Sequence, residues 1–189
     1  MSLPPSEIPL GAMRFNSDSQ KLEYWNGSAW FQIQTFSPNL DGGARGVFHA
    51  GRTSSGTEVN NIDFITISTQ GNAADFGDLT GNAYGVSGCS NAIRGLFGLG
   101  NVSGNSNRID FVTITTLGNS QDFGDLQANY YAQASTSSPT RGIFGGHYPS
   151  NNSIDYVQIM TKGNSIDFGD LTSGRGHFDA CSNGHGGLG

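Results

Sequence analysis

The pentapeptide DFGDL occurs three times, at residues 75–79, 122–126 and 167–171. Successive copies start 47 and 45 residues apart, an interval that fits one small supersecondary unit. A kinase-type DFG aspartate acts on metal and phosphate together with a glycine-rich loop, a strand lysine and an H-R-D loop, and none of these accompanies the motif here. The motif therefore indicates a repeated structural unit rather than nucleotide chemistry.

Each copy of DFGDL belongs to a longer pattern with one constant and one variable spacing. An aspartate in the pattern I-D-[FY] always precedes the first motif aspartate by twelve residues, as in Asp63 to Asp75, Asp110 to Asp122 and Asp155 to Asp167. Each repeat opens with an arginine, namely Arg45, Arg94 or Arg141, whose distance to the motif varies. Constant spacing is typical of a packed core segment and variable spacing of a surface loop.

Four strand signals recur in every repeat. They are a glycine-bounded triplet (GVF, GLF, GIF), an alternating segment (IDFITIS, IDFVTIT, IDYVQIM), DFGDL itself, and a fourth segment (YGVSG, YYAQAS, GHFDAC). We expect an all-β domain over residues 45–189 with three four-stranded repeats of about 47 residues. The expected boundaries are 45–93, 94–140 and 141–185, and residues 186–189 begin a fourth unit.

Residues 1–44 carry a different pattern. The stretch GAMRFNSDSQKLEYWNGSAWFQI predicts three strands at 12–16, 21–25 and 28–33, with Asn26-Gly27 as the hairpin turn between the last two. The segment that follows, up to residue 44, reads as a linker. We therefore expect an N-terminal three-stranded β-meander that is separate from the repeats.

Composition disfavours several classes of partner. The 189-residue chain has a net charge of −6 and only nine lysines and arginines, so we expect neither nucleic acid nor an anionic membrane as a partner. No apolar run reaches the length of a membrane span, and the N-terminus lacks the pattern of a signal peptide. We expect a product that is soluble where it is made.

Two resemblances point to a class of protein. Residues 11–33 resemble a β-meander common in virion structural proteins of tailed bacteriophages, and the repeats resemble arrays in virion proteins of marine phages, including those of cyanobacteria. The repeats are also similar to Kelch-type propeller blades, although the double glycine of a Kelch blade is intact only at Gly145-Gly146. These resemblances imply a fibre, spike or decoration protein on the virion, attached through the meander to other virion proteins and displaying the repeats.

Three repeats are fewer than the four to eight blades of typical propellers. One solution is a homodimer with six blades, in which the terminal GGLG of one chain supplies a strand to the other. The alternative is a β-prism or a trefoil, complete in one chain or built as a phage-fibre trimer.

The repeated charged residues have two interpretations. The acids could ligate calcium, but three identical placements favour a structural role as acceptors of backbone N–H groups in turns. The arginines are expected to bridge to the I-D aspartates as structural latches. We expect no catalytic, cofactor or metal site, and we expect Cys89 and Cys181 to be small buried residues. The repeated set is Asp63, Asp75, Asp78, Asp110, Asp122, Asp125, Asp155, Asp167, Asp170, Arg45, Arg94 and Arg141.

Three variable loops, at 52–61, 101–107 and 147–152, fall at the same point of each repeat and should share one rim. Polar side chains there would display hydrogen-bonding groups to a host glycan or receptor, which is the alternative function, or would simply be solvated. The candidate residues are Glu58, Asn60, Asn101, Asn105, Tyr148 and Asn151.

Overall fold

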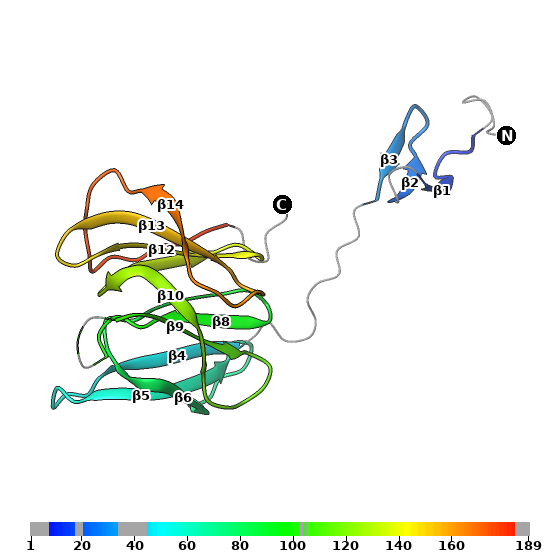
Figure 1. Cartoon of the computed structure of the whole chain (residues 1–189). Helices are drawn as coiled ribbons and strands as arrows, with labels where there is room; N and C mark the ends of the chain where they lie inside the picture. Colours follow the sequence, from blue (N-terminus) through cyan, green and yellow to red (C-terminus); the bar gives the residue numbers. More distant parts are fainter. Residues whose placement is uncertain (1–7, 18–20, 34–44, 103, 105, 184–189) are drawn as a thin grey trace. The chain divides into compact units, whose positions relative to one another are not determined.

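The computed structural model describes residues 8–17, 21–33, 45–102, 104 and 106–183. The chain divides into two units, Met1–Gly42 and Gly43–Gly189. All regular elements of the described residues are β-strands in small antiparallel sheets, which confirms the all-β prediction (Figure 1). The expected linker at 34–44 and the expected start of a fourth unit at 186–189 lie outside the described residues.

The first unit is a meander of β1 (Met13–Asn16), β2 (Lys21–Trp25) and β3 (Trp30–Gln32), as predicted. The Asn26 side chain accepts hydrogen bonds from the backbone of Ser28 and Ala29 and so shapes the turn before β3. On the sheet, Glu23 accepts bonds from Asn16 and Arg14, which lower the pKa of its carboxyl.

The second unit contains three sheets. The first sheet comprises β4 (Arg45–Arg52), β5 (Glu58–Thr66) and β6 (Ala74–Ala83) in that order. The second comprises β7 (Ser87–Ser90), β8 (Arg94–Gly98), β9 (Ser106–Thr113) and β10 (Gln121–Tyr130). The third comprises β11 (Ala134–Ser137), β12 (Arg141–His147), β13 (Asn151–Gln158) and β14 (Ile166–Asp170). Figure 1 shows them as successive layers.

In the first two repeats, the fourth strand forms at the C-terminal end of the predicted segment or just beyond it and joins the next sheet along the chain. β7 pairs with β8, and β11 pairs with β12, so each of these strands leads its sheet rather than closing the one before. The first sheet therefore has three strands among the described residues. The expected strand in GHFDAC does not form, and residues 176–181 have no strand assignment.

A β-bulge at the phenylalanine of DFGDL explains why this pentapeptide recurs. In β6, Asp75 pairs with Asp63 and Gly77 with Ile62, so Phe76 is an extra residue in the ladder. Strict alternation would put Phe76 and Leu79 on opposite faces because they are three residues apart, and the bulge brings both onto one buried face. Gly77, which follows the bulge, has a φ of 145°, which favours glycine. The ladders of β10 and β14 shift at the same position.

The core lies between neighbouring sheets. Phe76 and Ile62 of the first sheet pack with Phe97 and Val112 of the second. A larger cluster joins the second sheet to the third. Successive side chains of β9 point to opposite faces of the sheet, so Phe111 packs in the larger cluster and Val112 in the cluster with the first sheet. Each sheet thus has a forward face, toward the next sheet in sequence, and a backward face.

Candidate functional site

The I-D aspartates hold neighbouring sheets together. Asp110, on the backward face of β9, is fully buried, and one oxygen of its carboxylate accepts bonds from the Thr80 backbone at 2.9 Å and the Thr80 hydroxyl at 2.6 Å. The same oxygen accepts a bond from the Ser120 hydroxyl at 2.7 Å. Arg108 Nε lies 3.4 Å from the other oxygen. A carboxylate with these partners ties the first sheet to the second.

Asp155 repeats this arrangement between the second and third sheets. Its carboxylate accepts bonds from the Gln127 backbone at 2.8 Å and from the Ser165 hydroxyl at 2.9 Å. Burial and this carboxylate raise the pKa of the neighbouring Tyr130 to about 12. Asp63 occupies the equivalent place on the first sheet, but it is exposed because no sheet among the described residues covers that face.

The glycine of DFGDL lets the backbones of two sheets meet. A Cβ on Gly77 would lie 2.5 Å from the Gly118 carbonyl carbon, and a Cβ on Gly124 would lie 2.4 Å from the Gly163 carbonyl oxygen. Backbone hydrogen bonds cross at this point, from Gly118 N to Phe76 O at 2.8 Å and from Gly163 N to Phe123 O at 3.0 Å. DFGDL of one sheet therefore docks against the glycine-asparagine turn of the next.

The motif aspartates contribute to this junction through their backbone. Asp78 accepts a bond from Ser120 N at 2.8 Å and donates from its own N to the Asn119 side chain at 3.1 Å, and Asp125 does the same with Ser165 and Asn164. Asp75 and Asp122 expose their side chains to solvent, as do Asp167 and Asp170. In the described part of the chain, no three His, Cys, Asp or Glu residues are placed to hold a metal ion.

The first two opening arginines bind the neighbouring sheet, and the predicted partner was wrong. Arg45 donates to the carbonyl of Ile114 at 2.8 Å, and Arg94 donates to that of Ile159 at 3.1 Å. Neither bond goes to an I-D aspartate, because that carboxylate lies on the backward face while the arginine reaches forward. Each guanidinium also stacks on the aromatic residue that follows the aspartate, as in Arg94 over Phe111 at 4.8 Å and Arg141 over Tyr156 at 4.9 Å.

The variable loops lie at the ends of the strands opposite the glycine-asparagine turns. In the first loop, Arg52 pairs with Glu58 at 3.1 Å and its guanidinium lies 3.5 Å from the centre of the Tyr84 ring. Tyr84 in turn exchanges two backbone hydrogen bonds with Asn101 of the second loop. The first two candidate loops are thus joined through one tyrosine.

An aromatic row continues from Tyr84 to the third loop. Tyr131 lies 5.3 Å from Tyr84 and 5.9 Å from Tyr148, measured between ring centres, and His177 contacts both Tyr131 and Tyr148. Tyr148 and His177 are exposed, and the other two rings are half-buried. Tyr84 and Tyr131 were not among the residues predicted from the sequence, although each stands five residues after the leucine of its DFGDL, and this repetition is visible in the sequence.

The remaining predicted loop residues serve local structure. The Asn151 side chain accepts a bond from Ser153 N at 2.6 Å, and Asn101 accepts one from Gly104 N at 3.0 Å. Asn60 is a half-buried residue of β5. Asn105 lies outside the described residues.

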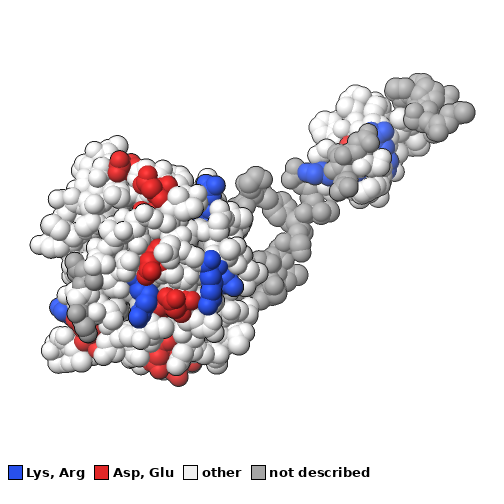
Figure 2. All heavy atoms as spheres, in the orientation of Figure 1, with Lys and Arg blue, Asp and Glu red and all other residues white. Residues whose placement is uncertain are grey.

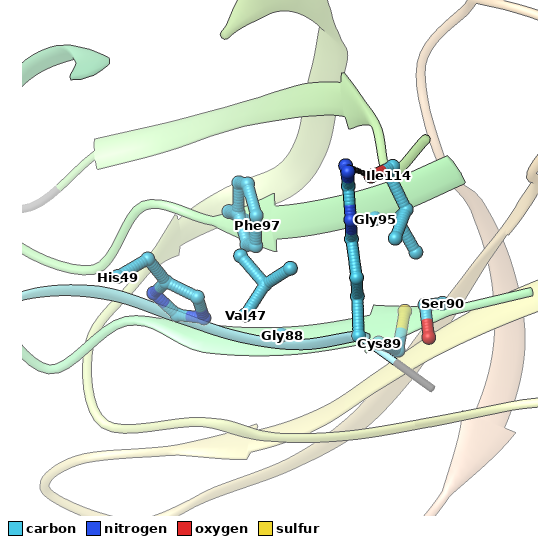
Figure 3. Close-up of a pocket in the computed structure, with 9 residues that line it drawn as sticks. Val47, His49, Gly88, Cys89, Ser90, Gly95, Phe97 and Ile114 are labelled. Atoms are coloured by element: carbon cyan, nitrogen blue, oxygen red, sulfur yellow. Dashed lines mark hydrogen bonds between the residues drawn. The ribbon is translucent and has the colours of Figure 1, made fainter. Parts of the chain in front are cut away.

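A hollow of about 140 Å³ lies between the first and second sheets near β4 and β7 (Figure 3). His49 stands beside Phe97 with 4.3 Å between the ring centres, and burial lowers the pKa of its imidazole to about 4. Burial also raises the pKa of the Cys89 thiol to about 12. Both groups are therefore neutral at neutral pH, and the hollow is smaller than the roughly 300 Å³ at which small-molecule pockets begin. Cys181, expected to be buried like Cys89, is exposed.

Figure 2 shows acidic side chains over all three sheets on one face, with basic side chains in separate small groups. No helix in the described ranges is long and apolar enough to cross a membrane.

No protein-family model matches the chain, and no curated protein matches it significantly.

Proposed function

We propose that this chain is a structural component of a tailed-phage virion, a fibre, spike or decoration protein that displays the three-sheet unit on the particle. The observation that carries the proposal is the use of the repeated residues. Asp110, Asp155, Gly77 and Gly124 make contacts between sheets, so repetition here builds a scaffold. The resemblance of residues 11–33 to a virion meander supplies the class of particle and assigns that unit to attachment.

Labelling of purified particles tests this function. An antibody raised against residues 45–189, imaged by electron microscopy, should decorate intact virions at fixed positions. The same antibody preabsorbed with the purified protein serves as the control and should leave the particles bare. Label at the tail tip or fibres identifies a fibre component, and label over the head identifies a decoration protein. Particles that carry neither label nor the protein by mass spectrometry would refute the proposal.

A second candidate function, recognition of a host glycan or receptor, is favoured by the aromatic row. The exposed ring of Tyr148 and, at the other end of the row, Arg52 over the half-buried Tyr84 offer the apolar faces and hydrogen-bonding groups that sugars use. Under this function, Tyr148→Ala should reduce adsorption of particles to cells while their content of the protein stays unchanged. Leu117→Ala is the matched control, because Leu117 is equally exposed but lies at the opposite strand ends. Equal adsorption by the two variants would reject glycan or receptor binding by this row.

A further inference from the structure

The two ends of the stack of sheets have complementary open faces. Phe97 and Phe144, on the backward faces of the second and third sheets, are buried, whereas Phe48 at the same position of the first sheet is 57% exposed. On the forward faces, Phe76 and Phe123 are buried, whereas Phe168 of the third sheet is 51% exposed. Each end thus presents one half of a junction that the chain already forms twice.

The polar half of the junction is also unused at both ends. Thr80 and Gln127 donate their backbone N–H groups to the buried aspartate of the following sheet. Asp63, the aspartate without a covering sheet, is exposed, whereas Asp110 and Asp155 are buried, and no further sheet among the described residues offers a carboxylate to Thr172, the counterpart of Thr80. Gly169 has a φ of 138° like its counterparts, yet a Cβ there would meet nothing within 4 Å. The close approach that explains glycine at this position is absent only at the end of the stack.

The two ends of the stack are complementary in a third feature, the strand that precedes β8 or β12 in the order of its sheet and that we call the leading strand. β4 pairs with β5 alone among the described residues, whereas β8 and β12 each carry a leading strand, β7 or β11. Next to β11 lies a further segment, because Ser182 donates its hydroxyl to the carbonyl of Ser137 just as Ser137 donates to Ser90. Residues 179–182 therefore lie beside β11 as β11 lies beside β7, but no sheet among the described residues pairs with them.

We propose that a second copy of this chain docks head to tail on these ends. The forward face of the third sheet on one copy packs against the backward face of the first sheet on the other. Residues 179–182 add to the free edge of β4 as its leading strand, and Thr172 donates to Asp63. The occupant is a second copy because both halves of an interface already present within the chain are exposed at its two ends.

Two single-face variants of the full-length chain test this docking. Phe168→Asp blocks the forward face of the third sheet, and Phe48→Asp blocks the backward face of the first. Because both residues are exposed, each variant should keep the circular dichroism of the unmodified protein and, at concentrations where the protein is monomeric, its melting temperature. Sedimentation across a wide concentration range should show that the unmodified protein self-associates. The dissociation constant of each variant alone should be at least about 30-fold higher, which is the effect of losing one interface hot spot.

Mixing the two variants distinguishes head-to-tail docking from any other association. Each variant retains one intact face, so the mixture should form a one-to-one complex with the affinity of the unmodified interface. Ile166→Asp is the control on the same strand, since Ile166 is 58% exposed and its counterparts Ala74 and Gln121 stay exposed inside the chain. It should leave association unchanged. A monomer at every concentration, association that resists either variant, or a mixture that fails to form the complex overturns the proposal.

Discussion

Replacement of Asp110 by asparagine should destabilise the three-sheet unit, whereas the same change at Asp63 should not. One oxygen of Asp110 accepts three hydrogen bonds from Thr80 and Ser120, and hydrogen bonds to a charged group contribute about 1.5–3 kcal/mol each against about 1 kcal/mol for neutral partners. An asparagine that keeps all three bonds as a neutral acceptor would also turn its amide group toward Arg108. We therefore expect a loss of about 2–4 kcal/mol.

Urea denaturation followed by far-ultraviolet circular dichroism measures this loss. Tryptophan fluorescence is unsuitable because Trp25 and Trp30, the two tryptophans of the chain, lie in the meander unit. Asp155→Asn, which weakens two bonds to Gln127 and Ser165, should cost somewhat less than Asp110→Asn. Asp63→Asn, at an exposed position, should stay within about 0.5 kcal/mol at concentrations where the protein is monomeric. Equal losses for Asp110→Asn and Asp63→Asn would refute the role of the buried aspartate in joining the sheets.

Three further outcomes are expected. Gly124→Ala and Gly169→Ala both place a side chain at positive φ, but only the methyl group at position 124 meets the neighbouring backbone. Calorimetry of the monomer should therefore show that Gly124→Ala lowers the free energy of unfolding by about 1–3 kcal/mol more than Gly169→Ala does. Similar melting temperatures of the two variants would disprove the close approach. As the pH falls from 6.5 to 4, the free energy of unfolding should fall by up to about 3 kcal/mol through His49, because the unfolded chain binds a proton there that the folded chain excludes. His49→Gln should remove that part of the pH dependence. An unchanged slope of stability against pH in this variant would contradict burial of the ring. A thiol reagent at pH 8 should label Cys181 rapidly and Cys89 only on unfolding, as followed by mass spectrometry, and rapid labelling of both would show that the sheets separate easily.

The strands were predictable because their signals are local. Alternation in IDFVTIT and the repeated DFGDL identify β9 and β10 closely, and the Asn26-Gly27 turn locates the meander hairpin. The pairing of β7 with the following sheet was not predictable, because strand pairing depends on contacts distant in sequence. For that reason the predicted repeat boundaries divide the second and third sheets between two repeats.

The roles of the repeated residues were only partly predictable. Asp63 and Asp110 have nearly the same sequence neighbours, yet one is exposed and the other fully buried, because burial is decided by whether another sheet covers that face. The bulge that turns Phe76 inward also depends on pairing with β5. A structural role for the acids could be inferred from their repetition, but it belongs chiefly to the I-D aspartates rather than to the carboxylates of DFGDL.

Hydrogen exchange of individual amides tests most directly whether neighbouring sheets are held by one repeated junction and whether the ends of the stack are open. Gly118, Ser120, Gly163 and Ser165 donate their amides across the junctions, whereas Gly71 and Ala73 hold the equivalent places on the uncovered first sheet. In monomeric protein, nuclear magnetic resonance should show slow exchange at the first four and fast exchange at Gly71 and Ala73. Both should become protected as the concentration rises and a second copy docks. Equal protection of all six amides in the monomer, or fast exchange of all six, would contradict the account.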